Sequence, residues 1–455
     1  MSIAIDPDGG TEMSEISVES VAVDGSTVEY AVEYSRDLRR FFDASTFSVS
    51  YDVDVSDVPR GVLTVPVLAQ VCPIAWATDS TVSVGTVDRT FVEGLEAVRA
   101  TLERMYPEVM TGGELDAEAV VEYNHDPGSF DGSAQLFSGG VDSLATYVRH
   151  RATDPALIAI QGWVVGVDED ERWQRAMGHV ERFAERTDSD THGITAGISE
   201  FLDHTMLNVH YKHHTDGGWY SGIGHGIGLL GVCAPLAYSQ GYGVVHMGST
   251  HWDGLELETV TWPGRGSPWG SHPEIDDNVQ WAGTSGHHDA YEITRQDKLE
   301  LLADYARETD QTFVIRTCTY DDAGGNCNRC EKCVRTATGL MLAGVDPNDF
   351  GYRVDADWYD YVIDRFEEND WALDEHVRHY WEDIQAHLPP AGSLPHEESE
   401  AFVEWIARND FADNVEHSTQ PAWVRLLRVG ARAAPYEVYE YLYPIYDRFR
   451  PDPYS

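Results

Sequence analysis

The residues best suited to chemistry form the run 138–143, with the sequence SGGVDS, directly after an apolar stretch. Its two glycines let backbone N–H groups turn toward one point, and a following helix would direct its positive end there. Ser138 and Ser143 add hydroxyl donors, and Asp142 can cap the helix or help to hold a phosphate-bound magnesium ion. The run lacks the Gly-Lys-Ser/Thr ending of a Walker A loop. We interpret it as a phosphate loop; the alternative is a plain strand–turn–helix connection.

The second group with clear chemistry is a set of four cysteines with the spacing C-x8-C-x2-C-x2-C, namely Cys318, Cys327, Cys330 and Cys333. Two-residue gaps let neighbouring thiolates converge on one tetrahedral ion. Four thiolate ligands leave no coordination position for water, so the spacing predicts a structural zinc site. Disulfides and an iron–sulfur cluster are the alternatives.

Cationic side chains surround these cysteines in a chain that has only three lysines. Arg316, Arg329, Lys332 and Arg335 lie within or beside the cluster. They would offset the negative charge of four thiolates on one zinc ion, and one of them could also meet a phosphate group.

These motifs resemble those of the PP-loop ATP pyrophosphatase superfamily, whose hallmark is Ser-Gly-Gly-x-Asp-Ser. The cysteine spacing, the pair Gly339-Leu340 and the pair Asp297-Lys298 make the chain most similar to 7-cyano-7-deazaguanine synthases. The resemblance covers residues 131–345. It implies the parallel-sheet fold of adenine-nucleotide α-hydrolases and cleavage of ATP to AMP and pyrophosphate. A carboxylate or amide oxygen of the acceptor would be adenylated, and a nitrogen nucleophile would displace AMP.

The resemblance also implies roles for individual residues. Asp142, Ser143 and Lys298 would be catalytic, and Mg²⁺ would accompany ATP. The residues expected to bind ATP are Ser138, Gly139, Gly140, Val141, Asp142, Ser143, Lys298, Gly248 and Ser249. The segments 221–226 and 248–252 differ from the corresponding family segments, which indicates an altered acceptor pocket.

Strands and helices must position these groups, and the pattern predicts three regions. Residues 1–130 alternate as strands around a helix at 91–105 and are expected to form an α+β accessory domain. Residues 131–345 alternate strands and helices, which predicts an α/β domain with a parallel sheet. Residues 346–455 have helical spacing. Within the middle region, strands are expected at 134–137, 156–160, 244–247 and 312–315, and helices at 143–149, 171–185, 226–239, 296–309 and 330–343.

Composition narrows the function classes. The chain has 455 residues, and 31 Lys and Arg against 78 Asp and Glu give a formal net charge of −47. Acids spread along the chain with few lysines indicate adaptation to high salt. This charge argues against general nucleic-acid binding. No apolar run approaches the roughly 20 residues of a membrane span, and the first 12 residues do not resemble a secretory signal. We therefore expect a cytoplasmic protein.

Two alternative functions remain open at this stage. One is tRNA modification by the same ATP chemistry; the other is a nucleotide-binding subunit of an anti-phage defence complex. The enlarged chain is similar to synthase-like proteins of such systems, and a homodimer or partner proteins are possible. The pairs His213-His214 and His287-His288 could indicate a second metal site, although adjacent histidines rarely bind one ion. His225 is a candidate for ligand contact.

Overall fold

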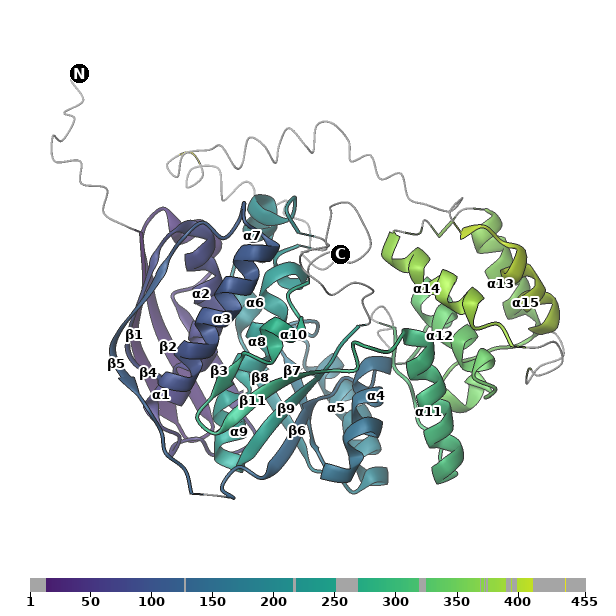
Figure 1. The fold of residues 1–455 in the computed structure, drawn as a ribbon, viewed down its shortest axis with the longest axis horizontal. Coiled ribbons are helices and arrows are strands. Elements are labelled where there is room, and N and C mark those ends of the chain that lie inside the picture. Colours follow the sequence, from purple (N-terminus) through teal and green to yellow (C-terminus); the bar gives the residue numbers. More distant parts are fainter. Residues whose placement is uncertain are drawn as a thin grey trace.

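Figure 1 shows the fold in a computed structural model of the chain. The structure describes residues 14–126, 128–215, 218–250, 269–318, 325–368, 370, 371, 373, 375–389, 394, 399–411 and 438. Two stretches named in the sequence analysis lie outside the described residues. They are 251–252 of the expected acceptor-pocket segment and, apart from residue 438, residues 412–455 of the expected helical region.

The described strands form one sheet of 11 strands in the order β10-β11-β9-β6-β7-β8-β3-β2-β1-β4-β5. The neighbours from β11 to β8 are parallel, as are β1, β4 and β5, whereas β3 pairs antiparallel with β8. The strands are β1 Glu15–Asp24, β2 Thr27–Tyr34, β3 Thr46–Tyr51, β4 Thr81–Asp88, β5 Glu114–Val121, β6 Gly132–Leu136, β7 Ala156–Gln161, β8 Thr191–Ala196, β9 Tyr242–Gly248, β10 Gln280–Trp281 and β11 Thr284–Asp289. The expected boundary near residue 130 thus falls between two strands of the same sheet.

Helices cover this sheet and extend beyond it at the C-terminal side (Figure 1). Helix α4 packs on β6 and β9, and α5 packs on β7 and β8. The helices are α1 Arg60–Leu63, α2 Val65–Thr78, α3 Arg89–Met105, α4 Val141–His150, α5 Asp170–Thr187, α6 Ile198–Phe201, α7 His204–Tyr211, α8 His225–Val232, α9 Ala234–Gln240, α10 Pro273–Asp276, α11 Arg295–Thr309, α12 Glu331–Leu342, α13 Ala356–Glu367, α14 Glu375–Ala386 and α15 Ser399–Arg408. Short 3-10 turns occur at Leu38–Phe41, Arg151–Thr153 and Pro347–Phe350, and a π-helical turn at Tyr220–Gly224.

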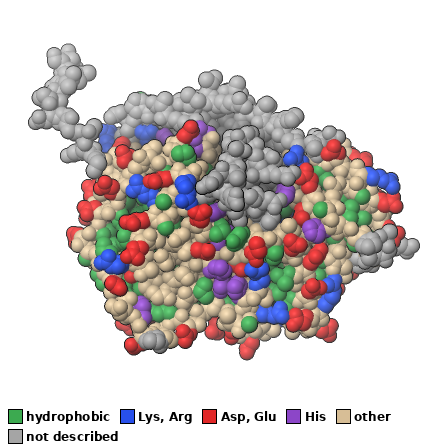
Figure 2. Space-filling model, viewed as in Figure 1, with side chains coloured by type: hydrophobic (Ala, Val, Ile, Leu, Met, Phe, Trp, Pro, Cys, Tyr) green, Lys and Arg blue, Asp and Glu red, His purple; other side chains and the backbone are tan. Residues whose placement is uncertain are grey.

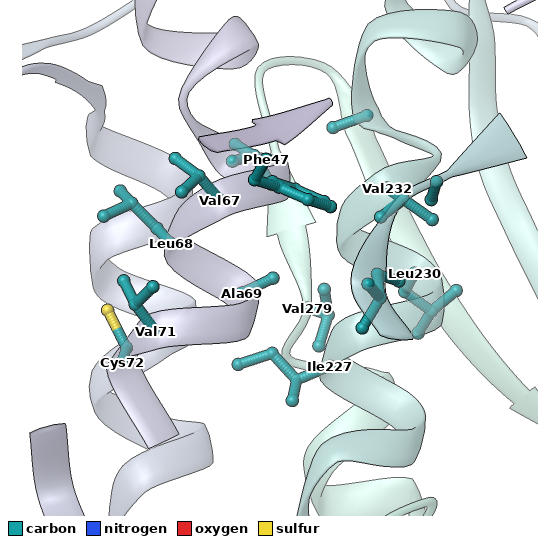
Figure 3. Close-up of a cluster of buried hydrophobic side chains, with 14 of the residues drawn as sticks. Phe47, Val67, Leu68, Ala69, Val71, Cys72, Ile227, Leu230, Val232 and Val279 are labelled. Atoms are coloured by element: carbon teal, nitrogen blue, oxygen red, sulfur yellow. The ribbon is translucent and has the colours of Figure 1, made fainter. Parts of the chain in front are cut away.

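Two hydrophobic cores lie in the described structure. The first joins the N-terminal strands to α2, α8 and α9, and Figure 3 shows α2 side chains facing Ile227, Leu230 and Phe47. Helix α2 is apolar and buried nearly all round, as expected for a helix enclosed by other elements. The second core joins α4, α5, α11 and α12 to the C-terminal helices α13–α15. The cores therefore divide the chain differently from the three regions expected from the pattern.

Most expected elements are confirmed, and one strand is wrong. The α/β class, the parallel strands at 134–137, 156–160 and 244–247, and the middle-region helices are present, with the helix at 226–239 divided into α8 and α9 at Cys233. The expected strand at 312–315 is absent. Phe313 and Ile315 are buried in the second core while Val314 is 42% exposed, so the segment alternates like a strand. Instead of joining the sheet, the Ile315 N–H donates to the Phe350 carbonyl, and the N–H of the next residue, Arg316, donates to the Gly139 carbonyl.

Acidic side chains are spread over the face of the molecule shown in Figure 2 rather than gathered in one patch. Among the described residues, one helical run, 220–240, is long and apolar enough to cross a membrane. Most of this run is buried inside the protein. Because buried core helices of α/β proteins have the same composition, this run is weak evidence for a membrane span.

Candidate functional site

The phosphate loop connects the end of β6 to the start of α4. Gly139 has φ of +73°, a conformation that favours glycine, and its carbonyl accepts a hydrogen bond from the Arg316 N–H at 2.8 Å. Ser143 Oγ accepts from the Ser138 N–H at 3.3 Å, and Ser138 Oγ accepts from the Gly140 N–H at 3.3 Å. The two serines therefore shape the loop internally.

The first turn of α4 has no side-chain cap. Its N-cap residue is Gly140, and no side-chain hydrogen bond caps this end within the described structure. Asp142 lies in the first turn of the helix, where it is not the cap. The N-terminal N–H groups of this 10-residue helix thus keep the positive end of the helix dipole open to an anion.

Lys298 meets this loop from α11. Its side chain is fully buried, and its Nζ lies 2.9 Å from Asp142 Oδ1 and also donates to the carbonyl of Ser249. The neighbouring Asp297 forms a capping box with Thr294, which fixes the start of α11. The Asp297-Lys298 pair therefore combines a structural carboxylate with a lysine that points at the loop.

Asp142 is held as a carboxylate. Burial opposes ionisation, but the charges of Lys298 and Arg295 lower the pKa of Asp142 below its ordinary value. Arg295 Nη1 lies 3.8 Å from Asp142 Oδ2. Arg295 was not predicted from the sequence; its position three residues before Lys298, on the same face of α11, is the signal that could have found it.

Gly248 and Ser249 bring the end of β9 against the loop. A Cβ on Gly248 would lie 2.8 Å from the Asp142 carbonyl oxygen and 2.9 Å from Thr146 Oγ1, so only glycine fits here without a shift. Ser249 Oγ donates to the Asp289 carbonyl at 2.5 Å. The structure thus brings all the predicted loop residues, Gly248, Ser249 and Lys298 to one place at the carboxyl end of the parallel strands.

Further cations complete a cluster, which we define as Arg295, Lys298, Lys332 and Arg335. Arg335 stacks over the Tyr380 ring, with its Cζ 4.0 Å from the centroid, and its Nε lies 3.3 Å from Glu331. Burial and the charges of Arg295 and Arg335 lower the pKa of Lys332. Lys298 and Arg295 contact Asp142 in the first turn of α4, and Arg295 and Arg335 both lie over the Tyr380 ring, so the cluster extends from the start of α4 to α14. Tyr380, on α14, was also missed, because nothing in its local sequence indicates a ligand site.

The four cysteines form a compact group. Their Sγ atoms all lie within 4.8 Å of one another, and Cys327 Sγ is 3.8 Å from Cys333 Sγ. Tetrahedral zinc with Zn–S bonds of about 2.3 Å needs S–S separations of about 3.8 Å. A hydrogen bond from Cys333 lowers the pKa of Cys330 to about 5, toward the thiolate that binds metals. The cluster could therefore hold a metal ion such as zinc.

Asn326, not singled out from the sequence, orients this group. Its Oδ1 accepts from the Thr317 N–H at 3.0 Å and the Cys318 N–H at 3.3 Å, and its Nδ2 donates to the Ile315 carbonyl at 2.8 Å. Cys318 therefore approaches from an extended segment held by one amide side chain, and not from the end of a strand as expected.

His225 begins α8, and burial lowers the pKa of its imidazole to about 4. Its Nδ1 is buried without a hydrogen-bond partner among the described residues. A neutral, unpartnered ring nitrogen is compatible with the expected ligand contact.

No family model, curated protein or solved structure matches this chain. Assignment of a function therefore depends on the site itself and on the resemblance of its motifs.

Proposed function

We propose that this protein is an ATP-dependent adenylating enzyme of the PP-loop type, with an adenine-nucleotide α-hydrolase-like sheet and a structural zinc ion on its four cysteines. It would cleave ATP to AMP and pyrophosphate while activating a carboxylate or amide oxygen for attack by nitrogen. The acceptor pocket differs from that of 7-cyano-7-deazaguanine synthases, so the proposal names the acceptor only by this chemistry.

The observation that supports the proposal most is the concentration of positive charge at one point of a very acidic molecule. The cation cluster reaches the uncapped N-terminus of α4 through Lys298 and Arg295, in a chain with a net charge of −47. Within the part of the chain that the structure describes, Asp142 and Glu331 form ion pairs with members of this group. Neighbouring cations that repel one another are stabilised by a polyanion between them. The β- and γ-phosphates of ATP carry such charge.

Each group of residues would have a separate role in the reaction. The loop N–H groups and the first turn of α4 would bind the phosphates that leave as pyrophosphate. Lys298 and the other cations would stabilise the charge that develops on the leaving group. Magnesium, when bound, would offset phosphate charge, and the Asp142 carboxylate is the oxygen donor suited to hold it. Catalysis would come from positioning and charge stabilisation, since no side-chain nucleophile is required.

Product analysis tests this function. The full chain in high salt is incubated with Mg·ATP and candidate acceptors, including deazaguanine carboxylates with ammonia, and AMP, ADP and pyrophosphate are separated by ion exchange. We expect AMP and pyrophosphate from the wild type and none from Asp142→Ala. Asp304→Ala, an exposed carboxylate on α11, is the matched control and should keep activity.

Two results would count against the proposal. Release of ADP and phosphate would contradict cleavage between the α- and β-phosphates. Undiminished pyrophosphate release by a folded, zinc-loaded Asp142→Ala protein would contradict the role of the loop. ATP binding without AMP formation, across all acceptors and partners, would favour the nucleotide-binding subunit.

A further inference from the structure

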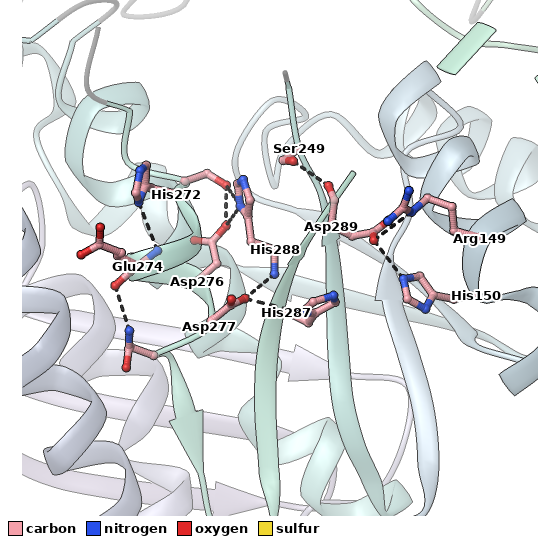
Figure 4. Close-up of polar contacts among 12 residues, drawn as sticks. Arg149, His150, Ser249, His272, Glu274, Asp276, Asp277, His287, His288 and Asp289 are labelled. Atoms are coloured by element: carbon pink, nitrogen blue, oxygen red, sulfur yellow. Dashed lines mark hydrogen bonds and ion pairs between the residues drawn. The ribbon is translucent and has the colours of Figure 1, made fainter. Parts of the chain in front are cut away.

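Three histidines from separate elements meet on one face of the sheet. Side chains alternate along a strand, so His287 and Asp289 of β11 point to the opposite face from His288, which bonds to Asp276 (Figure 4). His287 is the register partner of His246 on β9. His150, the last residue of α4, stacks on His246 with ring centroids 3.8 Å apart.

The rings offer nitrogens that converge. One ring nitrogen from each of His150, His246 and His287 lies within 4.8 Å of the other two. Within the described structure no hydrogen bond joins these rings. The His246 side chain is buried, with the residue only 5% exposed, and its Nδ1 has no hydrogen-bond partner. A buried imidazole nitrogen without a partner is costly unless something binds it.

Carboxylates contact two of the rings. His150 Nε2 lies 3.0 Å from Asp289 Oδ1, which Arg149 Nε also contacts at 3.1 Å. His287 Nδ1 lies 3.6 Å from Asp277 Oδ1. Histidines that bind metals commonly direct their second nitrogen to a carboxylate in this way, which fixes the tautomer and the ring orientation. The opposite nitrogens, His150 Nδ1 and His287 Nε2, are free of these carboxylate contacts.

The charge near the rings favours a cation. Asp289, whose side chain is 1% exposed, contacts His150, and Asp277 lies beside His287. Arg149 offsets part of the Asp289 charge. A dication among the three rings would therefore lie near carboxylate charge next to two of them.

We propose that His150, His246 and His287 bind one divalent first-row transition metal ion, Zn²⁺ by preference, separately from the four cysteines. Imidazole nitrogens are suited to zinc, copper, nickel and iron. The side chains of His150 and His287 are 23% and 44% exposed, so the coordination position not taken by the protein faces solvent. The ion ties the end of α4 to β9 and β11, and α4 carries Asp142 in its first turn.

Metal stoichiometry tests this site on the full chain. The metal-free chain receives one equivalent of Zn²⁺, which the four thiolates bind first, and is then titrated with Co²⁺, with visible spectra and metal analysis as readouts. We expect one further equivalent of cobalt per chain, with d–d bands and no intense thiolate charge-transfer band. The additional equivalent should be lost in His246→Phe and weakened at least about tenfold in His287→Gln.

Matched variants separate this site from adventitious binding. The double variant His213→Asn/His214→Asn removes two adjacent histidines that are not part of the proposed site. It should leave the additional equivalent of cobalt unchanged. Asp277→Asn keeps an Oδ1 acceptor for the His288 N–H and should weaken cobalt binding about tenfold. Circular dichroism checks that each variant folds. If His246→Phe does not fold, cobalt binding by His287→Gln, a change at a partly exposed residue, decides the test. The proposal is overturned if wild type carrying one equivalent of zinc takes up no cobalt. It is also overturned if cobalt affinity is undiminished in His287→Gln, or if uptake is lost with His213 and His214.

Discussion

At the scale of single residues, Gly248 shows how tightly the phosphate loop is packed. Replacing it by alanine would press a Cβ against the Asp142 carbonyl, 2.8 Å away, at the start of α4. Overpacking of this kind costs roughly 1–3 kcal/mol. We expect Gly248→Ala to lower the free energy of unfolding by that amount in urea denaturation and to weaken ATP binding.

Gly85→Ala is the matched control, because a Cβ at this strand glycine would meet only Glu118 Oε2, at 4.0 Å. It should change the free energy of unfolding by less than about 0.5 kcal/mol. Equal stability of the two variants would contradict the close approach of β9 to α4.

Residue types and spacing predicted much of this site, but only where the signal is local. The loop, Lys298 and the four cysteines lie in short motifs, and the structure brings the loop residues and Lys298 within contact distance. Arg295 and Tyr380 were missed because their contribution depends on how α11 and α14 pack. The three-histidine cluster was missed for the same reason: only pairing of β9 with β11 joins His246 to His287.

At the scale of elements, the cysteine group controls the start of α12. Cys330 is the N-cap residue of this helix, and α12 carries Lys332 and Arg335 of the cation cluster. Removal of a structural zinc ion should therefore lower the melting temperature and weaken ATP binding together. Thermal unfolding and ATP titration, before and after chelation, measure both effects.

Adding zinc back should restore both properties, and Cys330→Ser should reproduce the chelated state. An unchanged melting temperature after metal analysis has shown complete removal would contradict a structural role for the ion.

Helix α7 gives a pH dependence of stability. Burial lowers the pKa of His204 from 6.5 to about 4. The unfolded chain then binds more protons between pH 6.5 and 4, so the contribution of His204 to stability is complete above pH 6.5 and is lost as the pH falls. The loss at pH 4 amounts to roughly 3 kcal/mol.

His204→Leu should show a shallower decline of the unfolding free energy over this range than the wild type. Denaturant titrations at several pH values measure the difference in slope. Parallel pH profiles for the two proteins would mean that His204 is not held neutral by the fold.

Element assignment from the sequence succeeded where strands are short and apolar and where helices have clear apolar periodicity. Strand β7, with the sequence ALIAIQ, is buried along nearly its whole length, as parallel central strands are. The segment 312–315 misled the prediction because burial in a core can produce alternation without sheet pairing. Register and pairing partners, such as β3 with β8, are set by contacts that are distant in the sequence.

At the scale of the whole molecule, the acidic surface sets the conditions under which the protein is stable. The net charge is −47, so the acidic side chains repel one another. Salt shortens the range of this repulsion, from a screening length of about 10 Å at 0.1 M to about 3 Å at 1 M. We expect the melting temperature to rise by several degrees between 0.1 and 2 M KCl. Differential scanning fluorimetry over this series measures the effect, and a maximum at low salt would contradict the interpretation as adaptation to high salt.

The central claim is that the loop after β6 and the cation cluster form one site for the polyphosphate of ATP. Calorimetric titration of the full chain with Mg·pyrophosphate and Mg·ATP tests it without an acceptor. We predict one competitive site per chain, weakened at least about tenfold in Lys298→Met, as for loss of an interaction of about 1.4 kcal/mol or more. Arg307→Met, an exposed cation on the same helix, should bind as the wild type does. Absence of binding, or equal affinity for Lys298→Met and the wild type, would contradict the claim.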